Sequence, residues 1–165
     1  MDSITIRAGR KEDMSQIYDM IKQLAEFEKM ADQVKISTET LISDGFGSNP
    51  AFATFVACPA TDVNKIVGYA LYYPCYSTWV GKSVFLEDLF VLPEHRKGGV
   101  GKKLFLAVAK LAHESSKRMD FHVLSWNPAK DFYKALGCVN LTQEEDWNVY
   151  RLHNEDLAEV IKDLI

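Results

Sequence analysis

The sequence predicts an α/β domain in which helices cover both faces of a mixed β-sheet. Apolar residues recur at helical spacing in some segments and alternate with polar residues in others, and the two kinds of segment are interleaved along the chain. The length of 165 residues, without a Pro-, Gly- or Ser-rich linker, indicates a single domain over residues 1–165.

The first half of the chain should contain four strands and two helices. Met14, Ile17, Ile21 and Leu24 repeat at the spacing of a helix face, and Ser37 can cap a second, shorter helix. The expected order is a strand at residues 3–8, a helix from about 11 to 29, a helix from 37 to the turn at 44–47, and strands at 51–57, 65–73 and 83–92.

The second half should alternate between helices and strands. A glycine-containing loop follows Pro93, and Gly137 can end a helix because glycine readily adopts the left-handed conformation. The expected elements are a helix at residues 100–116, a strand at 120–125, a helix at 128–136, a strand at 147–152 and a C-terminal helix from Asn154.

Composition narrows the possible partners. A net charge of −4 gives no basic footprint for nucleic acid, and no apolar run is long enough to cross a bilayer, so we expect neither a nucleic-acid nor a membrane partner. The three cysteines and four histidines lack metal-ligand spacing, so no metal site is expected. Reduced cysteines favour a cytoplasmic protein.

The segment Arg96-Lys97-Gly98-Gly99-Val100-Gly101 is the strongest local motif, because it lies between a predicted strand and an amphipathic helix. Glycines allow backbone N–H groups to approach an anion, and the N-terminus of a helix adds a favourable dipole. Lys102 and Lys103 add positive charge. The spacing matches neither a dinucleotide fingerprint nor a P-loop.

The pattern R-x-x-G-x-G resembles the pyrophosphate-binding motif of the GCN5-related N-acetyltransferases. Asn127 followed by Asp131-Phe132-Tyr133-Lys134-Ala135-Leu136-Gly137 is similar to a second element of that family. Further segments resemble its diamine acetyltransferase subfamily, and within it the thialysine N-epsilon-acetyltransferase branch: residues 32–37, 44–47, 76–79 and 133–137. Together they cover almost the whole chain.

The resemblance implies a mostly antiparallel sheet with a splayed central strand pair. It also implies direct acetyl transfer from acetyl-CoA to the primary amine of a small lysine-like, diamine or polyamine substrate. It further implies a homodimer. It implies Tyr133 as general acid and Glu87 as base. Acetyl-CoA is expected to contact Leu89, Phe90, Val91, Arg96, Lys97, Gly98, Gly99, Val100, Gly101, Lys102, Asn127, Lys130 and Tyr133. The amine is expected to contact Phe27, Glu28, Trp79, Glu87, Asp88 and Glu145.

These residue types suit amine acetylation. An alkyl ammonium has a pKa of about 10.4, so it needs a proton acceptor and a site for its positive charge. Glu87 and Asp88 are neighbours on a predicted strand and should lie on opposite faces, so only one should face the substrate. Alternatively, these carboxylates are ordinary surface charges and Tyr133 is an aromatic anchor of its helix.

Two other functions remain open from the sequence. One is acetylation of a protein lysine or N-terminus, which needs an open groove in place of a closed acidic pocket. The other is a CoA-binding module without turnover. Four departures from the diamine pattern also matter. Phe27 and Ser77 replace a tyrosine and an aspartate of the spermidine/spermine branch, and Lys97 replaces the glycine usual after the motif arginine. The stretch from Asn127 to Tyr133 is also one residue shorter than usual.

Overall fold

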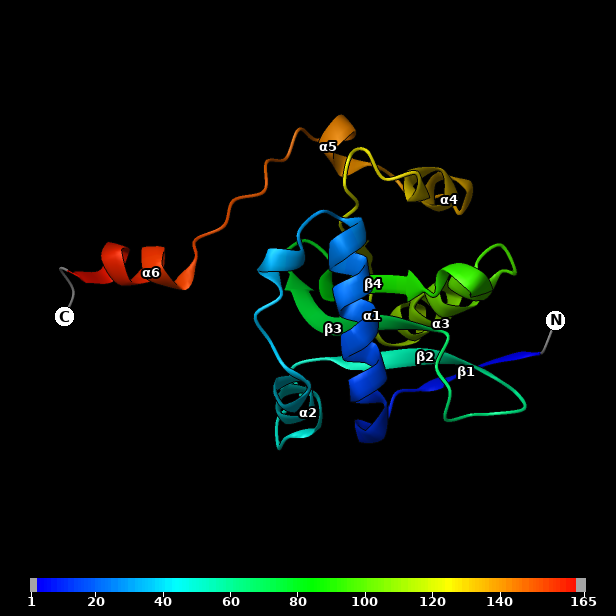
Figure 1. The fold of residues 1–165 in the computed structure, drawn as a ribbon. Helices are drawn as coiled ribbons and strands as arrows, with labels where there is room; N and C mark the ends of the chain where they lie inside the picture. The colour runs from blue at the N-terminus through cyan, green and yellow to red at the C-terminus, as the bar shows by residue number, and fades with distance from the viewer. Residues whose placement is uncertain (1–2, 163–165) are drawn as a thin grey trace. The chain divides into compact units, whose positions relative to one another are not determined.

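The computed structural model describes residues 3–162 and divides the chain into two compact units, Met1–Leu124 and Ser125–Ile165. The first unit contains the sheet (Figure 1), whose strands follow one another in chain order: β1 (Ile4–Ala8), β2 (Ala53–Pro59), β3 (Gly68–Ser77), β4 (Gly81–Val91) and β5 (Met119–Phe121). The first three pairings are antiparallel and β4–β5 is parallel, so the predicted mixed, mostly antiparallel sheet is confirmed.

Helices pack on both faces of this sheet. The strand residues Val56, Tyr69 and Leu71 form one core with α1 (Met14–Phe27) and α2 (Thr38–Phe46). Gly68 directly precedes Tyr69 and faces the opposite side of the sheet, toward α3 (Val100–Ser115), because a Cβ at this position would lie 3.3 Å from Leu104. The same Cβ would lie only 2.7 Å from the Phe90 carbonyl oxygen. Glycine at 68 therefore allows close packing on the α3 side.

Local signals explain where the helices begin. The Ser37 side chain accepts a hydrogen bond from the Thr40 N–H at 3.2 Å, which caps α2 as its sequence predicts. The 3-10 turn η1 (Lys11–Asp13) leads into α1, and its Asp13 carboxylate accepts bonds from Arg7 at 2.6 and 2.9 Å and from the Arg10 N–H at 2.7 Å. Two further 3-10 turns are η2 (Ala31–Gln33) and η3 (Pro93–His95).

The second unit contains three short helices, α4 (Ala129–Ala135), α5 (Leu141–Glu144) and α6 (Asn154–Ile161). Gly137, at φ 85°, follows α4, and the Cys138 N–H bonds back to the Tyr133 carbonyl at 3.1 Å, which confirms the predicted glycine stop. The described residues of this unit are exposed or only partly buried. Across the described chain no helix combines the length and apolar character needed to cross a membrane.

Two strand predictions differ from the structure. The strand expected at residues 147–152 is wrong: this segment has no regular structure, and its Val149 and Tyr150 are 73% and 91% exposed. Alternation alone does not form a strand, because the strand also needs a neighbouring edge to accept its hydrogen bonds. The strand expected at 120–125 is shorter and earlier, as β5, since its pairing with β4 covers only three residues.

Candidate active site

A β-bulge lies where two candidate acids occur in β4. Leu71 of β3 pairs with Asp88, and the next residue, Tyr72, pairs with Leu86, so Glu87 is an extra residue without a partner in β3. Bulges redirect side chains and are common beside active sites. The strand is therefore irregular at the position where the sequence places the proposed base.

The bulge brings both carboxylates to one face. The Tyr69 hydroxyl donates to Asp88 Oδ2 at 2.7 Å, and the Tyr73 hydroxyl donates to Glu87 Oε2 at 3.3 Å. Tyr69 and Tyr73 are four residues apart in β3 and so lie on the same face of the sheet. The prediction that Glu87 and Asp88 lie on opposite faces is wrong, because it assumed a regular strand.

A third carboxylate belongs to this cluster. Glu28 immediately follows α1, and its pKa is raised by burial and by the negative charge of Glu87. Burial likewise raises the pKa of Asp88 to about 6, against the lowering effect of the Tyr69 hydrogen bond, while Glu87 and Glu28 raise it further. Among the described residues, no Lys or Arg forms an ion pair with any of the three.

This arrangement favours an organic cation. Carboxylates that share a partly desolvated site repel one another, so a positively charged guest relieves an existing electrostatic cost. The described residues contain no group of His, Cys, Asp or Glu placed to hold a metal ion. Tyr69 and Tyr73 were missed by the sequence reasoning, because their place opposite the acids depends on the pairing register of β3 and β4.

The remaining predicted substrate residues have different surroundings. Phe27, the last residue of α1, is 42% exposed, and Trp79, in the β3–β4 turn, is 73% exposed. Ser77 holds this turn, since its hydroxyl oxygen accepts the N–H groups of Trp79 and Val80 at 3.2 and 3.3 Å. Glu145 lies in the second unit, where its carboxylate accepts a bond from the Trp147 indole at 2.6 Å.

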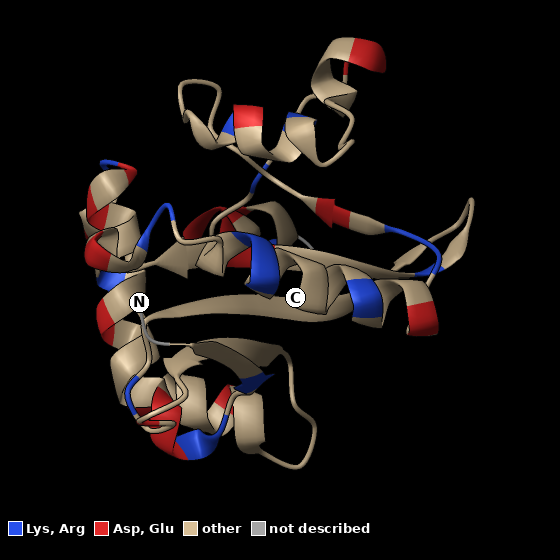
Figure 2. Ribbon diagram, turned by 90° about the vertical axis from the view of Figure 1, so that its right-hand side faces the viewer, with Lys and Arg blue, Asp and Glu red and all other residues tan. Residues whose placement is uncertain are grey.

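The glycine loop has the backbone conformation of an anion site. Gly99 precedes α3 in the left-handed conformation at φ 77°, and Lys97 adopts φ 63°, which is uncommon for a residue with a side chain. The first N–H groups of any α-helix lack acceptors within it, and no side chain caps α3. Figure 2 shows the basic residues along this part of the ribbon. Gly98, Val100, Gly101 and Lys102 complete the predicted loop.

The Arg96 side chain connects this loop to β4 of the sheet. Its Nε donates to the carbonyl of Val91, the last residue of β4, at 2.8 Å, and its guanidinium lies 5.3 Å from the centre of the Phe90 ring. The Phe90 side chain belongs to the core, so only its backbone can contact a ligand. The parallel β5 pairs with β4 only as far as Leu86, so the outer backbone edge of residues 87–91, including Leu89, is not paired with β5.

Tyr133, the predicted acid, lies in α4 of the second unit. Burial raises its pKa to about 12, and Cys138 adds to that shift. Asn127 accepts the Ala129 N–H at 2.9 Å and so fixes the start of α4, while the Lys130 ammonium donates to the Ser125 carbonyl. A tyrosine with this pKa is protonated at neutral pH, as a general acid must be.

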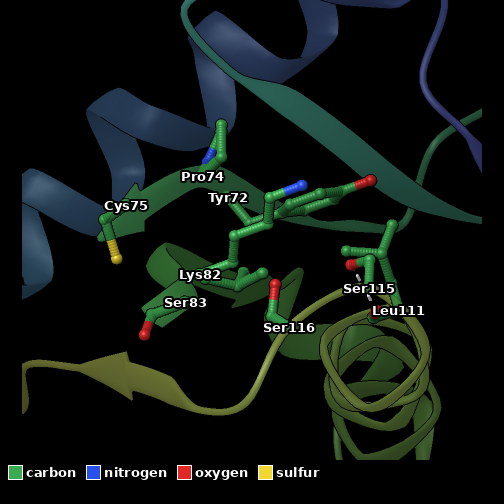
Figure 3. A pocket seen from close by; sticks show the side chains of 9 residues that line it. Tyr72, Pro74, Cys75, Lys82, Ser83, Leu111, Ser115 and Ser116 are labelled. Atoms are coloured by element: carbon green, nitrogen blue, oxygen red, sulfur yellow. Dashed lines mark hydrogen bonds between the residues drawn. The ribbon is translucent and has the colours of Figure 1, made fainter. Parts of the chain in front are cut away.

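A separate pocket of about 340 Å³ lies between β3, β4 and the end of α3 (Figure 3). Its lining includes Tyr72, Cys75 and Ser115, with Lys82 as its charged residue and no carboxylate. An ammonium substrate would find no counter-charge here. The acidic cluster at the bulge is therefore the better candidate for the amine site.

Comparison with known proteins agrees with this geometry. Residues 14–138 match the model of the acetyltransferase (GNAT) family. The chain is 44% identical to the thialysine N-epsilon-acetyltransferase of Sus scrofa, over 97% of this chain and 98% of that protein. It is 33% identical to the human spermidine/spermine N(1)-acetyltransferase-like protein 1, over 97% of this chain but 24% of that longer protein.

Solved structures share the fold at lower identity. An integron cassette protein of V. cholerae superposes with a TM-score of 0.75 at 22% identity, covering 97% of this chain and 98% of the other. An aminoglycoside acetyltransferase from an uncultured soil sample, in complex with sisomicin, has a TM-score of 0.68 at 19% identity and covers 92% and 95%. These similarities support the fold, and the sequence relatives support the family.

Proposed function

Because the chain belongs to the acetyltransferase (GNAT) family, we propose that it transfers acetyl from acetyl-CoA to the primary amine of a small lysine-like or diamine substrate, of which thialysine is an example. The observation that carries this proposal is the cluster of Glu28, Glu87 and Asp88, three carboxylates without a paired Lys or Arg among the described residues. A substrate with two positive groups can neutralise two of them.

The carboxylates have two tasks in this reaction. They bind the ammonium, and Glu87 takes its proton directly or through water, because only the neutral amine has the lone pair that attacks a carbonyl carbon. Glu87 is exposed at the bulge and can exchange that proton with solvent. Asp88 lies deeper and provides fixed negative charge.

Acetyl-CoA, when bound, supplies the acetyl group as a reactive thioester. The residues at the start of α3 fit its pyrophosphate: the uncapped helix offers N–H donors, the two left-handed residues Lys97 and Gly99 shape the loop, and Lys102 adds charge. N–H groups on the edge of residues 89–91 that β5 leaves unpaired can stabilise negative charge on the thioester oxygen. Asn127 and Lys130 remain predicted contacts.

Tyr133 is the proposed donor of a proton to the departing thiolate. A free thiol has a pKa of about 8.5, well below that of Tyr133, so the thiolate does not remove this proton at equilibrium. Partial transfer of the Tyr133 proton toward sulfur still stabilises the negative charge that develops while the carbon–sulfur bond breaks. Any proton that Tyr133 loses in this step is replaced from solvent.

The function is tested by measuring CoA release from acetyl-CoA at pH 8 with thialysine, lysine, short diamines, spermidine, spermine and a lysine peptide. We expect thialysine and short diamines to give the highest kcat/KM. Glu28→Gln should raise the amine KM, whereas Glu26→Gln, an exposed acid two residues earlier, should not. Activity on the peptide alone would indicate a protein acetyltransferase, and CoA binding without turnover a binding module.

We also propose a homodimer in the cytoplasm. The irregular segment that contains Trp147, Val149, Tyr150 and Leu152 exposes these four apolar side chains, and a second copy could cover them. The cysteines form no disulfide, which suits a reducing compartment. Sedimentation should give twice the 18.7 kDa chain mass, and Tyr150→Asp, which places a charge in this apolar segment, should shift the protein toward monomer.

A further inference from the structure

A buried tyrosine hydroxyl contacts the acidic cluster from within the core. Tyr69 is fully buried, and its ring packs among core residues that include Ile17 and Phe90. A phenylalanine would fill the same space without a polar atom to satisfy. The hydroxyl needs a partner in this position, and its partner is Asp88 Oδ2 at 2.7 Å.

This hydrogen bond counters the forces that would neutralise Asp88. Burial and the negative charges of Glu87 and Glu28 all favour the protonated acid, whereas a donated hydrogen bond favours the carboxylate. The titratable groups acting on this carboxyl are Tyr69 and Glu87, from β3 and β4, and Glu28 at the end of α1; Tyr73 in turn contacts Glu87. Among these described groups, Tyr69 alone lowers the pKa of Asp88.

We infer that Tyr69 is a positioning residue, whose hydroxyl holds Asp88 ionised and oriented toward the amine site beside Glu87. This inference rests on the proposed function, since it assigns Asp88 the fixed negative charge that binds the substrate ammonium. An amine site also needs Glu87 beside Asp88, and the bulge provides this arrangement because it directs Glu87 to the face that Asp88 occupies. Tyr69 thus sets the lower pH limit of amine binding.

The test is Tyr69→Phe, which keeps the ring and removes the hydroxyl. Its kcat/KM for one amine, divided by the wild-type value, should fall about fivefold near pH 6 and return toward one near pH 9, because the acid limb moves up by about one pH unit. Ionisation of the amine cancels in this ratio. The KM for acetyl-CoA should stay unchanged.

Two comparisons separate positioning from a general structural effect. Tyr72→Phe removes a half-buried hydroxyl on the opposite face of the same strand and should leave the pH profile unchanged. In an Asp88→Asn background, Tyr69→Phe should have less than about a twofold effect, since the interaction it acts through is already altered. A loss that is the same at every pH, or the same in the Asp88→Asn background, would overturn the inference.

A readout without substrate keeps this test independent of the proposed function. In protein labelled with ¹³C-carboxyl aspartate, the Asp88 resonance, assigned by its loss in Asp88→Asn, should titrate at higher pH in Tyr69→Phe. An unchanged midpoint would reject the role of Tyr69 even in an active enzyme. If the wild type acetylates no amine but the midpoint shifts, the proposed function fails and the Tyr69–Asp88 coupling stands.

Discussion

Asp88→Asn should make the fold more stable at neutral pH while it weakens amine binding. Asp88 has a pKa of about 6 in the folded protein, compared with an ordinary value of 3.8, and burial is the largest cause. A folded-state pKa above the unfolded value means that stability is lost as pH rises from about 4 through 6. Asparagine carries no charge and keeps an oxygen that can accept the Tyr69 hydrogen bond.

The magnitude follows from the difference of about two pH units. At 1.36 kcal/mol for each unit, the ionised carboxyl costs up to about 3 kcal/mol at pH 8, and about half of that is already present at pH 5. Asp88 retains some solvent exposure, and solvent screens part of this cost. We therefore expect Asp88→Asn to raise the free energy of unfolding by about 1–3 kcal/mol at pH 8.

Urea unfolding at pH 5 and pH 8, followed by tryptophan fluorescence, measures this gain. The advantage of Asp88→Asn should be larger at pH 8 by about 1 kcal/mol, with an unchanged m-value. A variant that is less stable than wild type at pH 8, or whose advantage is equal at both pH values, would refute the reasoning. A gain in stability with a higher amine KM is the trade-off expected of a binding site.

Three further predictions concern other parts of the chain. Tyr133→Phe should lower kcat by about a hundredfold while the Kd for CoA stays unchanged, and unchanged turnover would remove Tyr133 from the acid role. Lys97→Gly, at φ 63°, should raise the free energy of unfolding by about 0.5–1 kcal/mol in thermal denaturation, because glycine adopts this conformation without strain. Arg7→Met leaves the Asp13 carboxylate buried without its cation and should cost about 3 kcal/mol at pH 7. Arg7 lowers the pKa of Asp13, so this loss should shrink as pH falls below about 4 in urea unfolding, and a pH-independent loss would contradict it.

Local signals predicted much of the fold. Ser37 caps α2, Val100 begins α3 after the glycine loop, and Asn154 begins α6, each at the residue that the sequence indicates. These boundaries depend on capping and backbone conformation within a few residues. They are readable without knowledge of the neighbours in space.

Pairing between distant residues was not readable in the same way. The segment at 147–152 has strand-like alternation, yet the structure gives it no regular pairing. The placement of Glu87 depends on the register of β4 against β3, where one extra residue moves a side chain to the other face. Tyr69 and Tyr73 join the site through the same register, so no motif in either strand alone reveals them.

The bulge explains why the site is both costly and selective. In a regular strand Glu87 would face α3, and one carboxylate of the pair would be lost from the α1 side. The extra residue places Glu87 on the face of Asp88, and Glu28 at the end of α1 acts on the same cluster. Burial first, and then repulsion among these carboxylates, raises the pKa of Asp88 and of Glu28. A neutral ligand leaves that repulsion in place, whereas a ligand with two ammonium groups removes most of it. We therefore expect the electrostatic cost of the free protein to favour dicationic substrates, and we expect the Tyr69 hydrogen bond, by keeping Asp88 charged, to extend that preference toward neutral pH.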